Sequence, residues 1–566
     1  MICKGLRLRF LLGLTLIFGA QADAAVTARH QMVAAAHPLA AEAGLKILRN
    51  GGSALDAAIA VQMVLGLVEP QSSGIGGGAF LLYWDAAKKQ VTAYDGRETA
   101  PASVTPDLFM GADGEPLSFR EAFIGGRSVG VPGVIAMLAL AHQRYGKLPW
   151  KDLFQPAIAL AEQGFEVTPR LRIMLGAMTS LPSFPAARAL YFTASEPPQP
   201  LPPGTIVRNP DYARSLRLIA DGGADAFYTG PLAQAMVAAV AAAPGGGGLS
   251  LADLAAYRAK PREAVCGPYR KFRICGMPPP SSGGIGVLQI LGMLERFDMS
   301  ALGPGSVLPL HLLAQAERLA FADRNAYLGD TDFVPSPVAG LLEARYLAGR
   351  AKQIRSGRIA PSPVPPGAPA RRADFAPNAD ISLPSTSHFS IVDRDGNAVS
   401  MTSSIEAPFG SHVMAGGFFL NNQLTDFSFV PEAGGRPVAN AAAAGKRPLS
   451  SMAPVLVFGA EGGFYASLGS PGGTRIIGYV AQTLVGLLDW KLDMQQAMDT
   501  PRLLNRNGPL ELEAGTALEQ LAPRFEALGH TVEIQPVFSG LQGVRVAGDG
   551  LEGGADRRRE GVVLGD

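Results

Sequence analysis

The spacing of apolar residues predicts helices over the first two thirds of the chain. From Pro38 to Arg49 they recur at helical spacing, and a Gly-Gly pair ends the run. Ser53 can cap a second helix over residues 54–67, where nearly every position is apolar, so we expect that helix to be buried. Helical patterns continue to about residue 355.

Residues 72–80 interrupt this pattern with several glycines. Gly74, Gly76 and Ala79 fit the dinucleotide-binding pattern G-x-G-x-x-A. That pattern should follow a strand and open a helix, whereas here it follows a helix and opens an apparent strand at residues 80–84. We therefore interpret the segment as a tight backbone approach in the core and not as a nucleotide site.

The period changes to two after a proline-rich segment. Residues 360–384 contain seven prolines and few large apolar residues, which is typical of an extended, exposed chain that is open to cleavage. Apolar and polar residues then alternate on either side of an Asp-Gly pair at 395–396, which favours a hairpin. With that pair as the turn, residue 387 faces residue 404.

The rest of the pattern predicts strands at residues 417–421, 454–458 and 464–468 and a helix over residues 474–488. Strands here, with helices before and after them, favour a layered α+β sandwich to which both halves of the chain contribute.

Composition excludes several functional classes. Lys and Arg total 49 against 48 Asp and Glu, which argues against a nucleic-acid binder and against a polybasic membrane-surface protein. A hydrophobic content of 47% excludes a disordered chain. The seven His and three Cys form neither an HExxH nor a CxxC motif, so we expect no metal and no organic cofactor.

The N-terminus has the features of a secretory signal peptide. Lys4, Arg7 and Arg9 precede an apolar run at residues 10–20, and Ala-Asp-Ala at 22–24 is a small-x-small cleavage signal. The run is shorter than the roughly 20 residues that span a bilayer, although a retained anchor is the alternative. We expect cleavage after Ala24, a secreted, periplasmic protein and no stable membrane span.

Export makes a disulfide the favoured state of the two remaining cysteines. A two-residue turn at 270–271 pairs residue 269 with 272, and in the same register Cys266 with Cys275. This is a non-hydrogen-bonded pair, in which side chains lie closest. We predict a cross-strand disulfide; two buried thiols are the alternative.

Thr386 stands between the proline-rich segment and the first strand of the hairpin. A threonine freed at a chain start carries a nucleophile and a base, since its α-amine, with a pKa of about 7.7–8.0, can accept the hydroxyl proton. Ser404, near the end of the returning strand, could position that hydroxyl. Taken alone, a threonine that opens a strand is usually only a strand residue.

Further segments could complete a site around it. Residues 469–473 join a strand to a helix, and their backbone N–H groups could form an oxyanion hole, although an ordinary turn reads the same way. Arg97 lies in a turn-rich, mostly polar segment, Ser450 and Ser451 precede a strand, and Asp426 closes an amide-rich run. The arginine and the two serine hydroxyls could donate to the α-carboxylate of an amino-acid zwitterion, and the carboxylate could accept from its α-ammonium. Each motif alone, however, is more typical of polar residues at the protein surface.

These residues together match a known family. The chain resembles the γ-glutamyltranspeptidases (glutathione hydrolase proenzymes), which are N-terminal-nucleophile hydrolases, over nearly all of its length after residue 24. The motifs that carry the resemblance are His37-Pro38 with residues 51–58, then residues 69–80, 278–284, 386–393 with 395–397, 421–427, 446–452 and 469–473.

The resemblance implies an αββα sandwich formed jointly by two subunits of one inactive precursor. Self-cleavage of the Ser385–Thr386 bond would give a large subunit, residues 25–385, and a small subunit, residues 386–566, which stay together as a heterodimer. Thr386 would then attack γ-glutamyl donors such as glutathione, with the oxyanion held by the amides of Gly472 and Gly473. Water or an amino-acid or peptide acceptor would release the γ-glutamyl ester.

By the same resemblance, the remaining site residues bind the donor. Ser404 takes the place of a family Thr or Ser beside the nucleophile. The α-carboxylate is bound by Arg97, Ser450 and Ser451, and the α-amine by Gln423, Asp426 and Glu406.

The chain departs from the family pattern at two places. Residue 406 is Glu where some members have Asn, and a carboxylate still suits an ammonium group. The segment between Asp426 and Ser450 is rich in Pro, Gly and Ala, with Phe427 and Phe429 as its aromatics. Several members have a longer loop there with a tyrosine that covers the donor, so we expect a shortened lid and a more open pocket. The two cysteines are not part of the family pattern.

Two other functions fit parts of the pattern. One is an acylase for glutaryl or cephalosporin-type substrates; a glutaryl group has no α-amine, so Asp426 and Glu406 favour the glutamyl reading. The other is a non-catalytic periplasmic relative that only binds amino acids, against which the intact Ser385–Thr386 pair and the adjacent glycines 472 and 473 argue.

Overall fold

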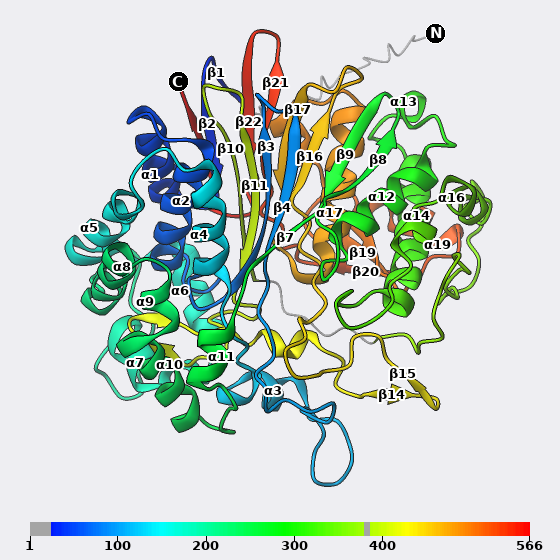
Figure 1. Cartoon of the computed structure of the whole chain (residues 1–566). Helices are drawn as coiled ribbons and strands as arrows, with labels where there is room; N and C mark the ends of the chain where they lie inside the picture. Colours follow the sequence, from blue (N-terminus) through cyan, green and yellow to red (C-terminus); the bar gives the residue numbers. More distant parts are fainter. Residues whose placement is uncertain (1–23, 379–384) are drawn as a thin grey trace, which may run out of the picture.

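Two seven-stranded antiparallel sheets lie face to face in the middle of the molecule (Figure 1). The computed structural model describes residues 24–378 and 385–566. One sheet has the order β1 (Val26–Ala28), β22 (Gly550–Ala555), β21 (Gln542–Ala547), β17 (Phe464–Gly469), β16 (Val455–Phe458), β9 (Phe272–Gly276) and β8 (Val265–Tyr269). The other has the order β23 (Val562–Gly565), β2 (Met32–Ala35), β10 (Ser387–Val392), β11 (Ala398–Ser404), β3 (Gly78–Asp85), β4 (Gln90–Gly96) and β7 (Lys260–Arg262).

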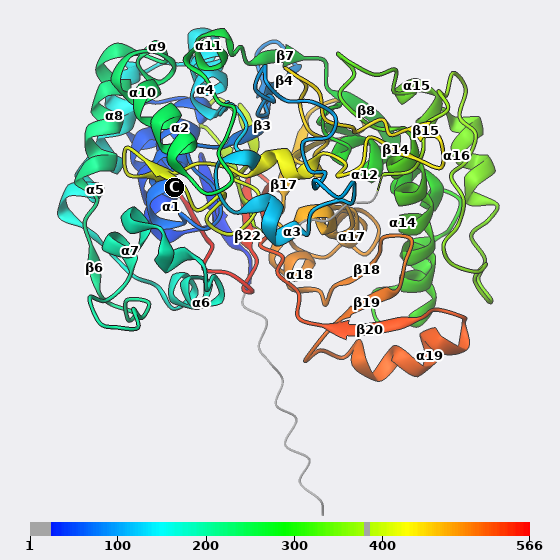
Figure 2. The same ribbon diagram turned by 90° about the horizontal axis from the view of Figure 1, so that it is seen from below.

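Helices cover both outer faces, which gives the αββα arrangement expected from the family (Figure 2). The β10 side is covered by α1 (Pro38–Arg49), α2 (Ala54–Val68), α4 (Val134–Tyr145), α5 (Gln155–Gln163) and α8 (Pro210–Gly222), with α10 (Gly230–Ala242) beyond them. The β16 side is covered by α12 (Gly283–Leu294), α14 (Val307–Tyr327), α16 (Ala344–Ala351), α17 (Ile476–Leu488) and α18 (Met494–Asp499). A small sheet of β18 (Leu503–Asn505), β19 (Leu510–Glu513) and β20 (Val532–Gln535) adjoins α14.

The helix α2 is buried on every side, as its composition predicts. Ser53 and Asp56 form a reciprocal capping box at its start. The glycine segment that follows α2 provides close packing: a Cβ on Gly77 would lie 2.1 Å from the carbonyl oxygen of Ser404. The segment opens the strand β3 and not a helix, which agrees with the rejection of a nucleotide site.

The hairpin of β10 and β11 differs by one residue from the predicted register. Ser387 pairs with Ser403 and not with residue 404, because residues 393–397 form the connection in place of a two-residue turn. The Asp393 carboxylate accepts hydrogen bonds from the backbone N–H groups of residues 395 and 397, both at 3.0 Å, and thereby holds this longer loop. Continued by one residue, the observed register sets Thr386 opposite Ser404.

Two other expectations differ in extent. The strand expected at residues 417–421 is limited to β13 (Phe418–Phe419), which pairs with β12 (Met414–Ala415). The proline-rich segment is mostly exposed and has no helix or strand over residues 360–378, while residues 379–384 lie outside the described chain. The expected signal peptide, residues 1–24, lies outside it except for its last residue.

Cys266 and Cys275 are opposite each other on β8 and β9 and form a disulfide. Their Cα atoms are 4.1 Å apart, which suits a non-hydrogen-bonded pair. No helix in the described ranges is long and apolar enough to cross a membrane.

We predict no free thiol in protein that lacks residues 1–24, when it is denatured without reductant and titrated with a thiol reagent. Reduction should expose two thiols and lower the free energy of unfolding by roughly 2–3 kcal/mol, since the bridge closes a short loop. A Cys275→Ser variant serves as the control and should show one thiol. Two thiols before reduction would contradict the bridge.

Candidate active site

Thr386 lies buried at the start of β10, where it is 4% exposed. Its Oγ1 donates a hydrogen bond to Ser404 Oγ at 3.1 Å, across the register that Asp393 sets. The Ser404 oxygen also accepts a hydrogen bond from the backbone N–H of Glu406 at 2.9 Å, which fixes its position. A hydroxyl pair of this kind can orient the threonine oxygen toward a reacting carbonyl.

The backbone at Thr386 is strained. Its φ angle is 111°, a conformation that β-branched residues almost never adopt, and such strain costs about 1–3 kcal/mol. The surrounding chain holds it there: the Thr386 N–H donates to the Ser72 carbonyl at 3.1 Å, and Ser385 Oγ donates to the Gln71 carbonyl. The peptide bond expected to break is therefore both buried and held in an unfavourable conformation.

The two glycines expected to form the oxyanion hole follow β17 and precede α17. Gly472 has φ 140° and Gly473 has φ 60°, and two successive residues in this region require glycine. A Cβ on Gly472 would also lie 2.8 Å from the Tyr479 ring. The glycine pair thus gives the backbone a shape in which neighbouring N–H groups can converge on an anion.

A cavity that is partly open to solvent joins these elements to the residues expected to bind the donor. Its lining combines strand ends of the central sheet with segments from both sides of the Ser385–Thr386 bond. The predicted residues that line it are Arg97, Thr386, Ser404, Glu406, Gln423, Asp426, Ser450, Ser451 and Gly473. The other two predicted residues, Gly472 and Ser385, are next in sequence to the lining residues Gly473 and Thr386.

Arg97 is fully buried, although the sequence indicated a turn-rich, mostly polar segment. It directly follows β4, and its Nε and Nη2 donate to the carbonyls of Pro448 and Leu449, both at 3.1 Å. Nη2 also contacts Asp426 Oδ2 at 2.5 Å. Arg97 was assigned to the α-carboxylate of the donor and Asp426 to its α-amine. In this structure the two side chains form an ion pair with each other.

The groups expected to bind the α-amine are acceptors held by neighbouring amides. Gln423 Nε2 donates to Asp426 Oδ2 at 2.8 Å, and Asn422 Nδ2 donates to Glu406 Oε2. Glu406 itself has φ 77°, so the chain bends sharply to bring its carboxylate to the cavity. Two carboxylates at one cavity suit a cationic group.

Arg324 is a lining residue that sequence reasoning missed. It comes from α14 and donates to Ser282 Oγ at 2.8 Å and to Ser451 Oγ at 2.9 Å. Ser282 in turn donates to the Ser450 carbonyl at 2.6 Å, so the 278–284 motif and α14 together hold the serine pair. The signal that could have found Arg324 is its charge, because it stands in a helix that is buried on nearly every side.

Glu98 is a second missed residue. It is fully buried, and its carboxylate lies 3.7 Å from Arg97 Nη1. Burial raises the pKa of Glu98 to about 8, against the opposing effect of Arg97. The raised pKa favours the protonated carboxyl group near neutral pH, so Glu98 competes little with Asp426 for the charge of Arg97.

Arg559 is the third, and it contacts Thr386, the expected nucleophile. Its Nη1 donates to the Thr386 carbonyl at 2.8 Å and its Nη2 to the Phe538 carbonyl at 3.1 Å. Burial lowers the pKa of Arg559 to about 9, so the side chain remains charged at neutral pH. In sequence it is one of three adjacent arginines, and nothing in that run singles it out.

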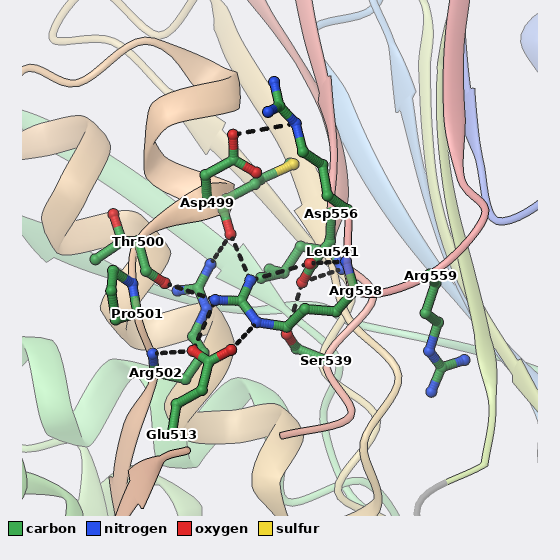
Figure 3. Close-up of polar contacts among 12 residues, drawn as sticks. Asp499, Thr500, Pro501, Arg502, Glu513, Ser539, Leu541, Asp556, Arg558 and Arg559 are labelled. Carbon is green, nitrogen blue, oxygen red and sulfur yellow. Dashed lines mark hydrogen bonds and ion pairs between the residues drawn. The ribbon is translucent and has the colours of Figure 1, made fainter. Parts of the chain in front are cut away.

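The neighbouring arginine anchors this segment. Arg558 pairs with Glu513 at 2.5 Å and with Asp556 at 3.0 Å. Figure 3 shows Arg558 within that cluster, while Arg559 points away from it. The ion pairs of Arg558 thus fix the chain from which Arg559 reaches the nucleophile.

The described residues contain no group of three or more His, Cys, Asp or Glu side chains arranged to hold a metal ion. The chemistry available at the cavity is that of hydroxyls, amides, guanidinium groups and carboxylates.

Comparisons with known proteins identify the family to which the chain is similar. The family described as gamma-glutamyltranspeptidase matches residues 40–566. The glutathione hydrolase proenzyme of Escherichia coli (strain K12) is 38% identical over 94% of this chain and 91% of its own length. The acylase ACY 1 proenzyme of Pseudomonas sp. (strain V22) is 37% identical over 95% of this chain and 94% of its own. The solved structure of the cephalosporin acylase from Bacillus halodurans superposes with a TM-score of 0.84 at 28% identity, covering 98% of this chain and 99% of that one.

We predict that Arg559→Ala slows the cleavage expected at residues 385–386 by at least about tenfold, because a charge-assisted hydrogen bond to Thr386 is lost. Arg559→Lys should restore part of the rate. Gel electrophoresis of freshly expressed protein over time measures the change. Arg557→Ala, on the neighbouring half-exposed side chain, is the control and should cleave at the original rate. Equal rates in all variants would contradict a role for Arg559.

Proposed function

The chain belongs to the γ-glutamyltranspeptidase family of γ-glutamyl hydrolases and transferases, and we propose that Thr386 is the nucleophile of both its self-cleavage and its catalysis. The observation that carries the proposal is the single cavity in which the Thr386 hydroxyl lies with a buried arginine, a serine pair and two carboxylates. These groups match a nucleophile and the two charges of a glutamyl head group.

Maturation begins with the strained bond. Thr386 Oγ1 attacks the carbonyl carbon of Ser385, the C–N bond between the two residues breaks, and the nitrogen takes a proton to become an α-amine. Water then hydrolyses the resulting ester, so that Ser385 ends the large subunit and Thr386 begins the small one. The subunits stay associated because β10 and β11 of the small subunit pair with β2 and β3 of the large subunit within one sheet.

Catalysis reuses the same oxygen. The α-amine of Thr386 accepts the hydroxyl proton as Oγ1 attacks the γ-glutamyl carbonyl, and the N–H groups of Gly472 and Gly473 stabilise the oxyanion. The proton passes to the leaving amine, and a γ-glutamyl ester remains on Thr386. Water or an amino-acid or peptide acceptor attacks this ester and restores the enzyme.

Donor recognition follows from the charges at the cavity. Arg97, Ser450 and Ser451 donate to the α-carboxylate, and the carboxylates of Asp426 and Glu406 accept from the α-ammonium. The incoming zwitterion replaces the Arg97–Asp426 ion pair with two pairs of its own. Glutathione, which the names of the hydrolase relatives specify, carries such a head group.

An acylase activity is the second candidate, since an acylase proenzyme and an acylase structure are both similar to this chain. The second carboxylate at the cavity favours glutamyl donors, because a glutaryl group offers no ammonium to Asp426 and Glu406. A glutaryl chain held by Arg97 would set the Asp426 and Glu406 carboxylates against an uncharged part of the ligand, which disfavours that chain.

We propose that the enzyme acts outside the cytoplasm after removal of residues 1–24. The Cys266–Cys275 disulfide supports this, since such bonds persist in oxidising compartments.

Thr386→Ala should give a single uncut chain without γ-glutamyl-p-nitroanilide turnover, because the attacking oxygen is gone. Intact mass spectrometry and turnover measured on the same sample test this. Wild-type protein should show two fragments, the smaller one beginning Thr-Ser-His-Phe. Two fragments from the variant would refute self-cleavage at this bond.

Asp426→Ala should lower kcat/KM for γ-glutamyl-p-nitroanilide at least about thirtyfold, as expected for a buried charge left without its partner. Glutaryl-p-nitroanilide, which lacks the α-amine, should lose less. Glu432→Ala, an exposed carboxylate on the same connecting segment, is the control and should change neither value. Equal losses for the two anilides would favour the acylase reading.

A further inference from the structure

The segment that follows Asp426 is folded away from the cavity. Asn440 holds its base: Nδ2 donates to the Asp426 carbonyl at 2.6 Å, and Oδ1 accepts from the Leu449 N–H at 3.0 Å. Its tip is an exposed hairpin of β14 (Glu432–Ala433) and β15 (Arg436–Pro437). Both views show this hairpin on the α16 side of the molecule (Figures 1 and 2). Among the described lining residues, none comes from residues 430–448.

Two aromatic residues at the start of this segment do line the cavity. Phe427 is 2% exposed and packs into a small apolar cluster with Phe109 and Leu424. Phe429 is only half-buried, so this lining residue is partly open to solvent. The segment therefore adds a partly exposed aromatic ring to a site with many polar groups in its lining.

Aromatic residues of the large subunit hold the Phe429 ring in place. Its centroid is 4.7 Å from that of Phe109, with an angle of 25° between the rings. It is 6.3 Å from that of Phe119, on α3 (Phe119–Phe123), with an angle of 9°. A ring fixed in this way loses little conformational entropy when a ligand packs against it.

The direction in which a donor must lie follows from burial. The groups that would bind the glutamyl head are at most 8% exposed, apart from the partly buried Asp426, and Thr386 beside them is 4% exposed. The group on the amide nitrogen of the donor must therefore leave the cavity toward solvent, and Phe429 is a lining residue that is itself partly open to solvent.

We propose that Phe429 makes the enzyme selective for donors whose γ-amide nitrogen carries an aromatic group, such as γ-glutamyl aromatic amino acids. This inference rests on the proposed function and adds a leaving-group class to it. Packing of two aromatic rings contributes beyond simple area burial, and we expect the ring to favour an aromatic leaving group about fivefold. A small polar leaving group gains nothing from the contact.

A matched pair of donors tests the proposal. γ-Glutamyl-L-phenylalanine and γ-glutamylglycine share the glutamyl head and the carboxylate of the leaving amino acid, and differ in the benzyl side chain. The quantity measured is the ratio of their kcat/KM values, which reports steps up to release of the leaving amine. Because both values come from one preparation, the ratio does not depend on the fraction of chain that has matured.

Wild-type enzyme should prefer the phenylalanine donor, and Phe429→Ala should reduce the ratio about fivefold, with kcat/KM for γ-glutamylglycine nearly unchanged. Phe429→Leu keeps an apolar side chain without the ring and should give an intermediate ratio; it carries the test if the alanine variant does not mature. Phe333→Ala removes an exposed phenylalanine outside the cavity lining and should leave the ratio unchanged.

The proposal would be overturned if the ratio in Phe429→Ala equalled the wild-type ratio. If only Phe429→Leu matures, the same comparison is made with that variant. A wild-type enzyme without preference for either donor would also overturn the proposal. Absence of turnover of both donors by the wild-type enzyme would instead overturn the proposed function, so the two failures are distinguishable.

Discussion

The site depends on the backbone of one residue being held where it would not go unaided. Thr386 has φ 111°, which costs about 1–3 kcal/mol, and the structure retains it through contacts on three sides. The Ser72 carbonyl accepts its N–H, Arg559 donates to its carbonyl, and Ser404 accepts its hydroxyl hydrogen. These partners come from segments far apart in sequence, so the geometry of the bond proposed to be cleaved requires a completed fold. We infer that folding must precede cleavage.

The charged groups of the site occupy the interior of the protein, where an unpaired charge is costly. The Arg97–Asp426 pair and the raised pKa of Glu98 both lower that cost. A glutamyl zwitterion can take over both partners of the pair, so its binding exchanges one set of buried ion pairs for another. A ligand with only one of the two charges would leave a partner unmatched. Specificity for the zwitterion thus arises as much from the cost of leaving a desolvated charge unmatched as from the attraction between opposite charges.

Local sequence patterns predict much of this molecule. The helix at Pro38–Arg49, the hairpin that follows Thr386 and the glycines that precede α17 all lie where spacing and turn residues place them. The register of the hairpin was wrong by one residue because the Asp393 side chain favours a longer loop, an interaction that no pairwise turn rule contains. Arg97 was assigned to a polar segment because the acceptors of its side-chain hydrogen bonds are about 330 residues away or more, and Arg559 was missed because its partner Thr386 is also distant in sequence. Long-range partners of buried charges are what the sequence pattern cannot supply.

The similarity to acylases has a physical explanation in this arrangement. The proposed nucleophile, its hydroxyl partner and the glycine pair belong to the two central sheets and their connections, which any amide of suitable shape could use. Selectivity resides in side chains that project from the rim of this scaffold, and these can change without altering the strands. Asp426 and Phe429 are three residues apart on one connecting segment. In the roles proposed for them, one binds the head of the donor and the other its leaving group, so changes within this short segment would alter both ends of substrate recognition while the catalytic core stays the same.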